Sequence, residues 1–173
     1  MHTVWVRLNA VVFFGLTVLL GLSCMAALSK VGHTLRQRPV VKKLEMRKFR
    51  SLKSHGGVDR ALLSFDLDVD LTPAFHWNIK QLFVYVVAIY ETNGRYNQVV
   101  LWDKIVEAGD SKVLKEKNTF IKYPLVDKRG GELRGKEVTL QLQWDHMPIT
   151  GLLHMDKQPL DTSSKFFLPT EYQ

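Results

Sequence analysis

Residues 61–71 have the sequence ALLSFDLDVDL, in which apolar and polar side chains alternate from Leu63 onward. The apolar positions are Leu63, Phe65, Leu67, Val69 and Leu71, and the polar positions between them are Ser64, Asp66, Asp68 and Asp70. Successive side chains of an extended strand point to opposite faces, so a period of two separates a buried face from a solvent face. The segment therefore predicts a half-buried β-strand.

Strand patterns continue on both sides of this segment. Residues 138–145 alternate in the same way, and residues 82–90 are almost wholly apolar and rich in β-branched and aromatic side chains, which is typical of a central strand. A further central strand is expected at 97–106. Weaker strand patterns occupy residues 40–50, 120–125 and 165–168.

Short turn signals separate these segments: Thr72-Pro73, Asn93-Gly94, Gly109-Asp110 and Gly130-Gly131. An Asn-Gly pair between two strand-like runs favours a tight β-hairpin. About seven short strands, with no long amphipathic helix among them, predict an all-β domain built as an antiparallel β-sandwich. We place this domain at residues 40–173.

The chain begins with a segment of a different kind. Residues 8–29, LNAVVFFGLTVLLGLSCMAALS, contain no charged side chain and would form about 33 Å of helix, enough to cross a bilayer. The alternative is a cleavable signal peptide, with Arg7 as its basic start and the small residues Cys24 and Ala26 before the cleavage site. The apolar run is longer than the roughly 7 to 15 residues typical of a signal peptide, so we expect a retained transmembrane anchor.

The net charge of +7 is concentrated in one place. Residues 30–60 carry a net charge of +8, whereas residues 61–173 carry −2. Basic residues next to a membrane span are expected to contact lipid head groups or an acidic partner, and no nucleic-acid-binding motif accompanies them. We expect residues 30–39 to form a basic stalk, and we expect no nucleic-acid partner.

The orientation of the anchor does not follow from charge alone. The positive-inside rule compares Arg7 and the N-terminal amine with the basic residues after the span, which are Lys30, Arg36, Arg38, Lys42 and Lys43. This comparison would place the β-domain in the cytoplasm. Long domains are translocated despite flanking charge, so the rule is a bias that other information can override.

Few residues suggest chemistry. Asp66, Asp68 and Asp70 have the spacing of a calcium loop, but Leu71 stands where such a loop needs glycine, so we expect three carboxylates on the solvent face of a strand. The six histidines lack zinc-ligand spacing, and no G-x-S-x-G motif marks a serine nucleophile. We expect no catalytic residue, no metal site and no cofactor.

The central part of the chain resembles a known family. The matching motifs are FHWNIKQLFVY at 75–85, YETNGRY at 90–96 and NQVVLWDKIV at 97–106. Supporting matches are SFDLDVDL at 64–71 and VTLQLQW at 138–144. With one N-terminal span before a single domain, the sequence is similar to the third subunit of eukaryotic signal peptidase. The motif positions are Trp77, Asn78, Lys80, Gln81, Phe83, Asn97, Gln98, Trp102, Asp103 and Lys104.

This resemblance implies a type II protein of the endoplasmic reticulum membrane. Residues 1–7 would be cytosolic, residues 8–29 would be the signal anchor, and the β-domain would be lumenal beside a separate catalytic subunit and the other subunits of the complex. The chain would support signal-peptide removal without cutting. One departure is that Glu137 stands where such proteins often carry the asparagine of a glycosylation sequon, so no glycosylation site is expected. The alternative function is an independent membrane-anchored β-sandwich that binds a ligand or an adhesion partner.

The motif residues also have structural interpretations. We expect Trp77, Phe83 and Trp102 to fill the core, and Asn78, Gln98 and Asp103 to hydrogen-bond backbone near the strand ends. If the motif contributes to an interface, Lys80, Gln81 and Lys104 are better candidates than the aromatic residues.

Overall fold

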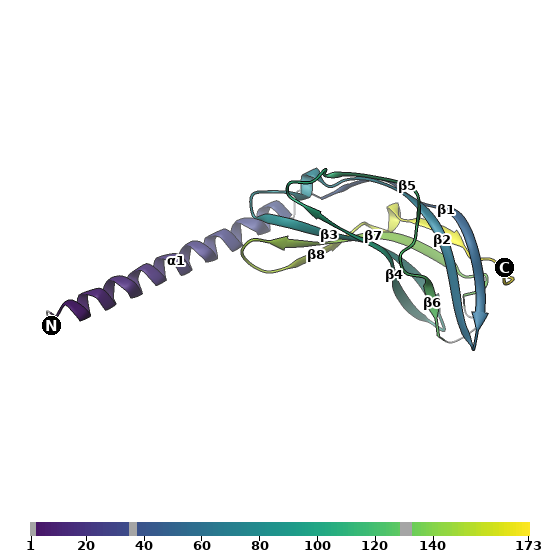
Figure 1. Ribbon diagram of the computed structural model, residues 1–173, viewed down its shortest axis with the longest axis horizontal. Coiled ribbons are helices and arrows are strands. Elements are labelled where there is room, and N and C mark those ends of the chain that lie inside the picture. The colour runs from purple at the N-terminus through teal and green to yellow at the C-terminus, as the bar shows by residue number, and fades with distance from the viewer. Residues whose placement is uncertain (1–2, 35–37, 129–132) are drawn as a thin grey trace.

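The computed structural model describes residues 3–34, 38–128 and 133–173. Its helix and strands are α1 (Val4–Thr34), β1 (Val40–His55), β2 (Val58–Asp70), β3 (Ile79–Thr92), β4 (Arg95–Glu107), β5 (Val113–Phe120), β6 (Leu125–Asp127), β7 (Glu137–Pro148), β8 (His154–Lys157) and β9 (Ser164–Phe167). Two short 3-10 helices are η1 (Thr72–Ala74) and η2 (Leu160–Thr162). Figure 1 shows α1 projecting from one end of an elongated β-domain, with the C-terminus at the opposite end.

The helix α1 contains the expected apolar run and extends beyond it at both ends. Its segment Val4–Leu28 is long and apolar enough to cross a membrane, and the most apolar window of that segment is not buried against any described part of the chain. The helix continues to Thr34, so the first residues of the expected stalk are helical. Pro39 is the first proline in the sequence, and a proline is what prevents a helix from continuing.

The β-strands form two sheets, and their pairings in the described residues are antiparallel. The four-stranded sheet has the order β1-β2-β5, with β6 also paired to β2. The five-stranded sheet has the order β4-β3-β7-β8, with β9 also paired to β7. The expectation of an all-β antiparallel domain behind one apolar helix is confirmed.

The core lies between the two sheets, and the alternation of residues 61–71 is reproduced in it. The apolar residues of this segment of β2, Leu63, Phe65, Leu67 and Val69, are buried. Asp66, Asp68 and Asp70 are half-buried, and Ser64 is the polar position of the alternation that is buried. Phe65 meets Trp102 of the opposite sheet edge-to-face, with ring centroids 5.9 Å apart. Apolar burial of this kind is the main term that holds two sheets together.

The expected hairpin at Asn93-Gly94 is confirmed. It joins β3 to β4, with Thr92 paired to Arg95. Asn93 and Gly94 both have positive φ, 50° and 70°, as a two-residue type I′ turn requires. The turn fixes the register of the two strands that carry most of the motif residues.

Two boundary expectations were wrong. Residues 121–124 connect β5 to β6, so the strand expected at 120–125 lies instead on either side of that connection. The strand β5 was missed because VLKEKNTF is mostly polar, as an edge strand with one solvated face can be. The strand expected at 40–50 is the edge strand β1, which runs on to His55 and contains about half of the basic segment 30–60. The Gly130-Gly131 turn lies outside the described residues.

Candidate functional site

The motif positions lie on two neighbouring strands. Trp77 and Asn78 come just before β3, the next three positions lie on β3, and the remaining five lie on β4. The register pairs Phe83 with Ile105, Tyr85 with Asp103, and Val84 with Lys104. Two sequence motifs that are separate along the chain therefore form one continuous part of the five-stranded sheet.

Residues directly opposite in register share a face, and here they define the outer face of the five-stranded sheet. This outer face comprises Gln81, Phe83, Tyr85, Val87 and Ile89 of β3, Gln98, Val100, Asp103 and Ile105 of β4, and Thr139, Gln141, Gln143, Asp145 and Met147 of β7. The rings of Phe83 and Tyr85 lie side by side with centroids 5.3 Å apart. Val100 and Ile105 are exposed beside them. The face is thus partly apolar, with exposed side chains on β4, whereas Tyr85, Val87 and Gln141 are buried.

A line of polar contacts crosses the same outer face. The Tyr85 hydroxyl donates to Asp145 Oδ1 at 3.3 Å, and Gln81 Nε2 lies 2.9 Å from Met147 Sδ. Farther along β7, Gln143 Nε2 donates to Gln141 Oε1 at 2.8 Å, and Gln141 Nε2 donates to the Gln158 carbonyl at 2.7 Å. These bonds hold the side chains of the face in fixed positions.

Burial changes the titration of the central pair. Desolvation, aided by the neighbouring Asp145 carboxylate, raises the pKa of Tyr85 to about 12. Desolvation also raises the pKa of Asp145, and the hydrogen bond from Tyr85 opposes that rise. Tyr85 and Asp145 are thus a partly desolvated, hydrogen-bonded pair that joins the side chains of β3 and β7.

An open depression of about 710 Å³ lies beyond this pair on the outer face. Its lining includes Tyr96, Gln98, Gln141, Glu137, Lys157 and Lys165. The lining contains both lysine and glutamate side chains, so it has no single sign of charge that would select a charged ligand. The extended, partly apolar form of the whole face suits a protein partner better than a small molecule.

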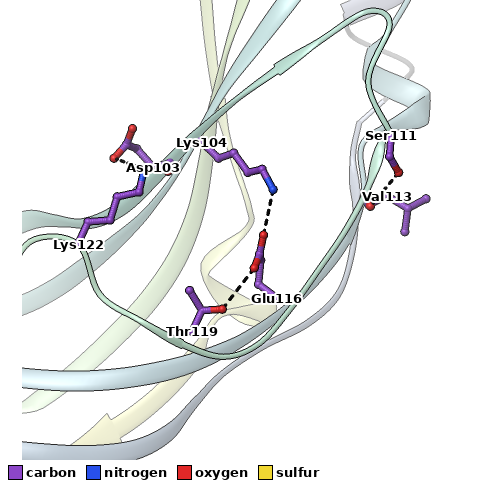
Figure 2. Close-up of polar contacts among 7 residues, drawn as sticks. All are labelled: Asp103, Lys104, Ser111, Val113, Glu116, Thr119 and Lys122. Carbon is purple, nitrogen blue, oxygen red and sulfur yellow. Dashed lines mark hydrogen bonds and ion pairs between the residues drawn. The ribbon is translucent and has the colours of Figure 1, made fainter.

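The edge where β4 approaches β5 is closed by polar contacts, which Figure 2 shows. Lys104 Nζ lies 3.0 Å from Glu116 Oε1 across the two sheets, and Thr119 Oγ1 donates to Glu116 Oε2 at 3.4 Å. Lys122 Nζ donates to the Asp103 carbonyl at 2.7 Å and lies 3.4 Å from Asp103 Oδ1. Asp103 and Lys104 therefore have structural partners within this chain.

The aromatic motif residues do not all lie in the core. Trp102 is 4% exposed, as expected, but Trp77 is 63% exposed, so its assignment to the core was wrong. Phe83 is half-buried on the outer face and is not part of the central core. Trp77 lies two residues before the first residue of β3, and its side chain is not among the described residues that pack between the two sheets.

Among the polar motif residues, Asn78 behaves as expected and bonds backbone at the start of β3. Its Nδ2 donates to the Thr150 carbonyl at 2.9 Å, and its Oδ1 accepts from the Thr150 N–H at 3.1 Å. Asn97 Nδ2 donates to Thr92 Oγ1 at 2.7 Å beside the hairpin. Gln98 is exposed at the depression, and Lys80 is exposed on the second residue of β3.

The acidic row of β2 is used for folding contacts. Asp66 Oδ1 accepts from the Asn118 N–H at 2.8 Å, and this bond is the main reason that the pKa of Asp66 is lowered. Asp70 bonds to Thr72, which lowers the pKa of Asp70. Among the described residues no group of three His, Cys, Asp or Glu side chains is arranged to hold a metal ion.

Two residues of the basic segment form ion pairs within the domain. Arg38 Nε lies 3.3 Å from Asp156 Oδ2 of β8, and Lys43 Nζ lies 3.3 Å from Asp66 Oδ2. Their charge is therefore partly compensated inside the protein. Arg36 lies outside the described residues.

Comparison with known proteins gives a consistent result. The family described as "Signal peptidase subunit" matches residues 1–171. A Drosophila melanogaster protein named "Signal peptidase complex subunit 3" is 37% identical, with 93% of this chain and 97% of the relative covered. Proteins of the same name from Gallus gallus and Homo sapiens are 37% and 35% identical, each with 95% of this chain and 91% of the relative covered.

Proposed function

Because the chain belongs to the signal peptidase subunit family, we propose that it acts as a non-catalytic accessory subunit of the signal peptidase complex in the endoplasmic reticulum. The match across residues 1–171 is the observation that carries this conclusion. A separate serine-type subunit performs the cleavage, and this chain holds that subunit in place for removing signal peptides from translocating proteins. An independent ligand-binding or adhesion module is not favoured by the family match.

In this proposal the chain is a single-pass type II membrane protein. Residues 1–7 are cytosolic, residues 8–29 cross the membrane, residues 30–39 form the stalk and residues 40–173 form the lumenal domain. The long apolar surface of α1 supports the span, since lipid is the environment in which exposed leucine, valine and phenylalanine side chains are stable.

The lumenal orientation has a direct test. The substitution Glu137→Asn creates an N-V-T acceptor at the exposed start of β7. Expressed in cells, this variant should gain a glycan that an endoglycosidase removes. The control adds Thr139→Ala, which destroys the acceptor and should abolish the glycan. A Glu137→Asn chain that folds into the complex without a glycan would contradict the orientation.

We place the contact with the catalytic subunit on the outer face of the five-stranded sheet. The exposed Val100 and Ile105, together with Phe83, give this face the apolar character common in the centre of stable interfaces. The fixed Tyr85–Asp145 contact reduces the side-chain entropy lost on binding.

A matched pair of variants tests this contact. Val100 on the outer face is 39% exposed, and Phe120 on β5 of the other sheet is 49% exposed. The substitution Val100→Glu should weaken recovery of the catalytic subunit by about tenfold or more, because it introduces an unpaired charge into an apolar contact. Phe120→Glu, which adds the same charge on the other sheet, should leave recovery unchanged. Equal effects of the two substitutions would remove the outer face from the proposal.

The accessory role itself is tested by purifying the tagged full-length chain in mild detergent. We expect a distinct serine-protease subunit to be recovered with it, and we expect the eluate to cleave a signal peptide. A solitary, inactive protein, under conditions that keep membrane complexes intact, would instead favour the ligand-binding alternative.

A further inference from the structure

The connection between β7 and β8 has an unusually apolar tip. Residues 149–153, named here the β7–β8 loop, have the sequence ITGLL. Leu152 is 85% exposed, and Ile149 and Leu153 are also well exposed. Met155, at the start of β8, extends the exposed apolar surface. Several large apolar side chains grouped on one exposed loop indicate a contact with something other than water.

The position of this loop indicates what it contacts. A Cβ placed on Gly151 would lie 3.3 Å from the Cβ of Ala27 and 3.6 Å from its Cα, so the loop backbone packs directly against α1. Small residues on both sides permit this close approach. Ala27 lies inside Val4–Leu28, the part of α1 that is apolar enough to span a membrane. Figure 1 shows the β7–β8 connection reaching back beside the end of α1.

The depth of the loop follows from the helix geometry. Ala27 is one residue before Leu28, where the apolar segment ends, so the loop lies at the level of one membrane surface. Trp77 is exposed at this end of the domain, next to Asn78, which bonds the loop at Thr150. Trp5 is also exposed. It precedes Ala27 by a length of α1 of about 33 Å, which is close to the thickness of a bilayer core. Tryptophan is enriched at both membrane surfaces, and these two residues match that distribution.

The loop is also held in place. Asn78 ties its base to the start of β3, and Ile149 N–H donates to the Asn78 carbonyl at 2.8 Å. The Arg38–Asp156 ion pair joins β8 to the chain that follows α1. The apolar tip is therefore presented at a fixed height beside the helix.

From this geometry we propose that the β7–β8 loop, together with Trp77, is a second membrane-contacting element that inserts into the interfacial region of the bilayer next to α1. At the boundary between lipid head groups and acyl chains, leucine side chains are removed from water and tryptophan can place its apolar ring in lipid and its N–H near the head groups. Two attachments, the helix and the loop, fix the tilt of the β-domain relative to the membrane. This inference goes beyond the accessory role and does not depend on which side of the membrane the domain occupies.

The test uses the full-length chain by itself in phosphatidylcholine vesicles. Cys24 is replaced by alanine to remove the native thiol, and Leu152→Cys or Leu153→Cys is labelled with an environment-sensitive fluorophore. Lipids carrying a quencher near the head group are then added. We expect blue-shifted emission and quenching at both positions.

The matched control is Leu160→Cys in the same background. Leu160 is also an exposed leucine, but it lies on η2 beside Ile89 and Tyr90, roughly 30 Å along β3 from the loop. Its label should show water-like emission and no quenching by lipid.

The outcomes separate lipid from a protein partner. If the labels at 152 and 153 give the same water-like signal as the label at 160, the loop does not enter the bilayer and the proposal is wrong. If they are water-like in the isolated chain and become shielded only when the catalytic subunit is added, the loop is a protein contact, which also overturns the proposal. Quenching in the isolated chain supports it whether or not the accessory role holds.

Discussion

Asn78 and Thr150 are 72 residues apart in the sequence and are joined by three hydrogen bonds. The Asn78 amide donates to the Thr150 carbonyl, and its oxygen accepts from both the backbone N–H and the hydroxyl of Thr150, at 2.9, 3.1 and 3.3 Å. Asn78 is completely buried. This one side chain connects the start of β3 to the β7–β8 loop.

Replacing Asn78 by alanine should lower the free energy of unfolding by about 2 to 3 kcal/mol, because backbone groups of Thr150 would lose their buried partners. Urea unfolding of the full-length chain in mild detergent, followed by tryptophan fluorescence, measures the change. The control is Gln98→Ala, an exposed motif position, for which we expect a change within about 0.5 kcal/mol. Similar losses for both variants would contradict a special role of Asn78.

The two motif tryptophans should respond very differently to truncation. Trp102→Ala should cost about 3 to 5 kcal/mol, since it leaves a cavity beside Phe65. Trp77→Ala removes a largely exposed side chain and should cost less than about 1 kcal/mol in detergent. Circular dichroism during urea unfolding gives both values. A larger loss at Trp77 would mean that this residue is covered by the protein.

Tyr85 should make the protein sensitive to alkaline pH. Its folded-state pKa of about 12 lies above the unfolded value of about 10, so the folded state holds the proton more tightly. The resulting stabilisation is present below pH about 10 and is lost as the pH rises to about 12, a change of about 2 kcal/mol. Tyr85→Phe should show a smaller loss of stability over this range.

The control for this pH dependence is Tyr96→Phe, because Tyr96 is exposed on the hairpin side of β4. Its unfolding curve should fall with pH as the wild-type curve does. If Tyr85→Phe also follows the wild-type curve between pH about 10 and about 12, the hydroxyl of Tyr85 does not titrate with unfolding.

The hairpin turn should tolerate substitution poorly at one glycine. Gly94 has a φ of +70°, which a residue with a side chain adopts only with strain, so Gly94→Ala should destabilise the domain by about 1 kcal/mol. Gly109 lacks a positive φ, and a Cβ added to it would have no other atom within 4 Å in the described part of the chain. Gly109→Ala should therefore be neutral or slightly stabilising in thermal unfolding. The reverse order would mean that the hairpin turn is not the type I′ turn described.

Local patterns were sufficient for several parts of this structure. The alternation at 61–71 predicted β2 because a strand with one buried face imposes a period of two on its own sequence. Asn93-Gly94 predicted the β3–β4 hairpin because the positive φ angles of its turn restrict the residue types that fit. The apolar run at 8–29 predicted α1 because the length of an uncharged segment is itself the signal.

Contacts between distant segments determined the rest. The sequence alone predicted that Trp77 is a core residue, because tryptophan is large and apolar. Whether a second sheet covers the side chain depends on the fold, and Trp77 is exposed. The sequence placed Arg38 in a basic segment expected to contact lipid head groups or an acidic partner, and only the fold shows that Asp156 of the same chain lies within 3.3 Å of it. Only the fold brings Gly151 of the apolar β7–β8 loop against Ala27 of α1. Periodicity reports the environment of a residue within its own element, whereas the fold decides which elements meet, because packing joins residues that the sequence separates.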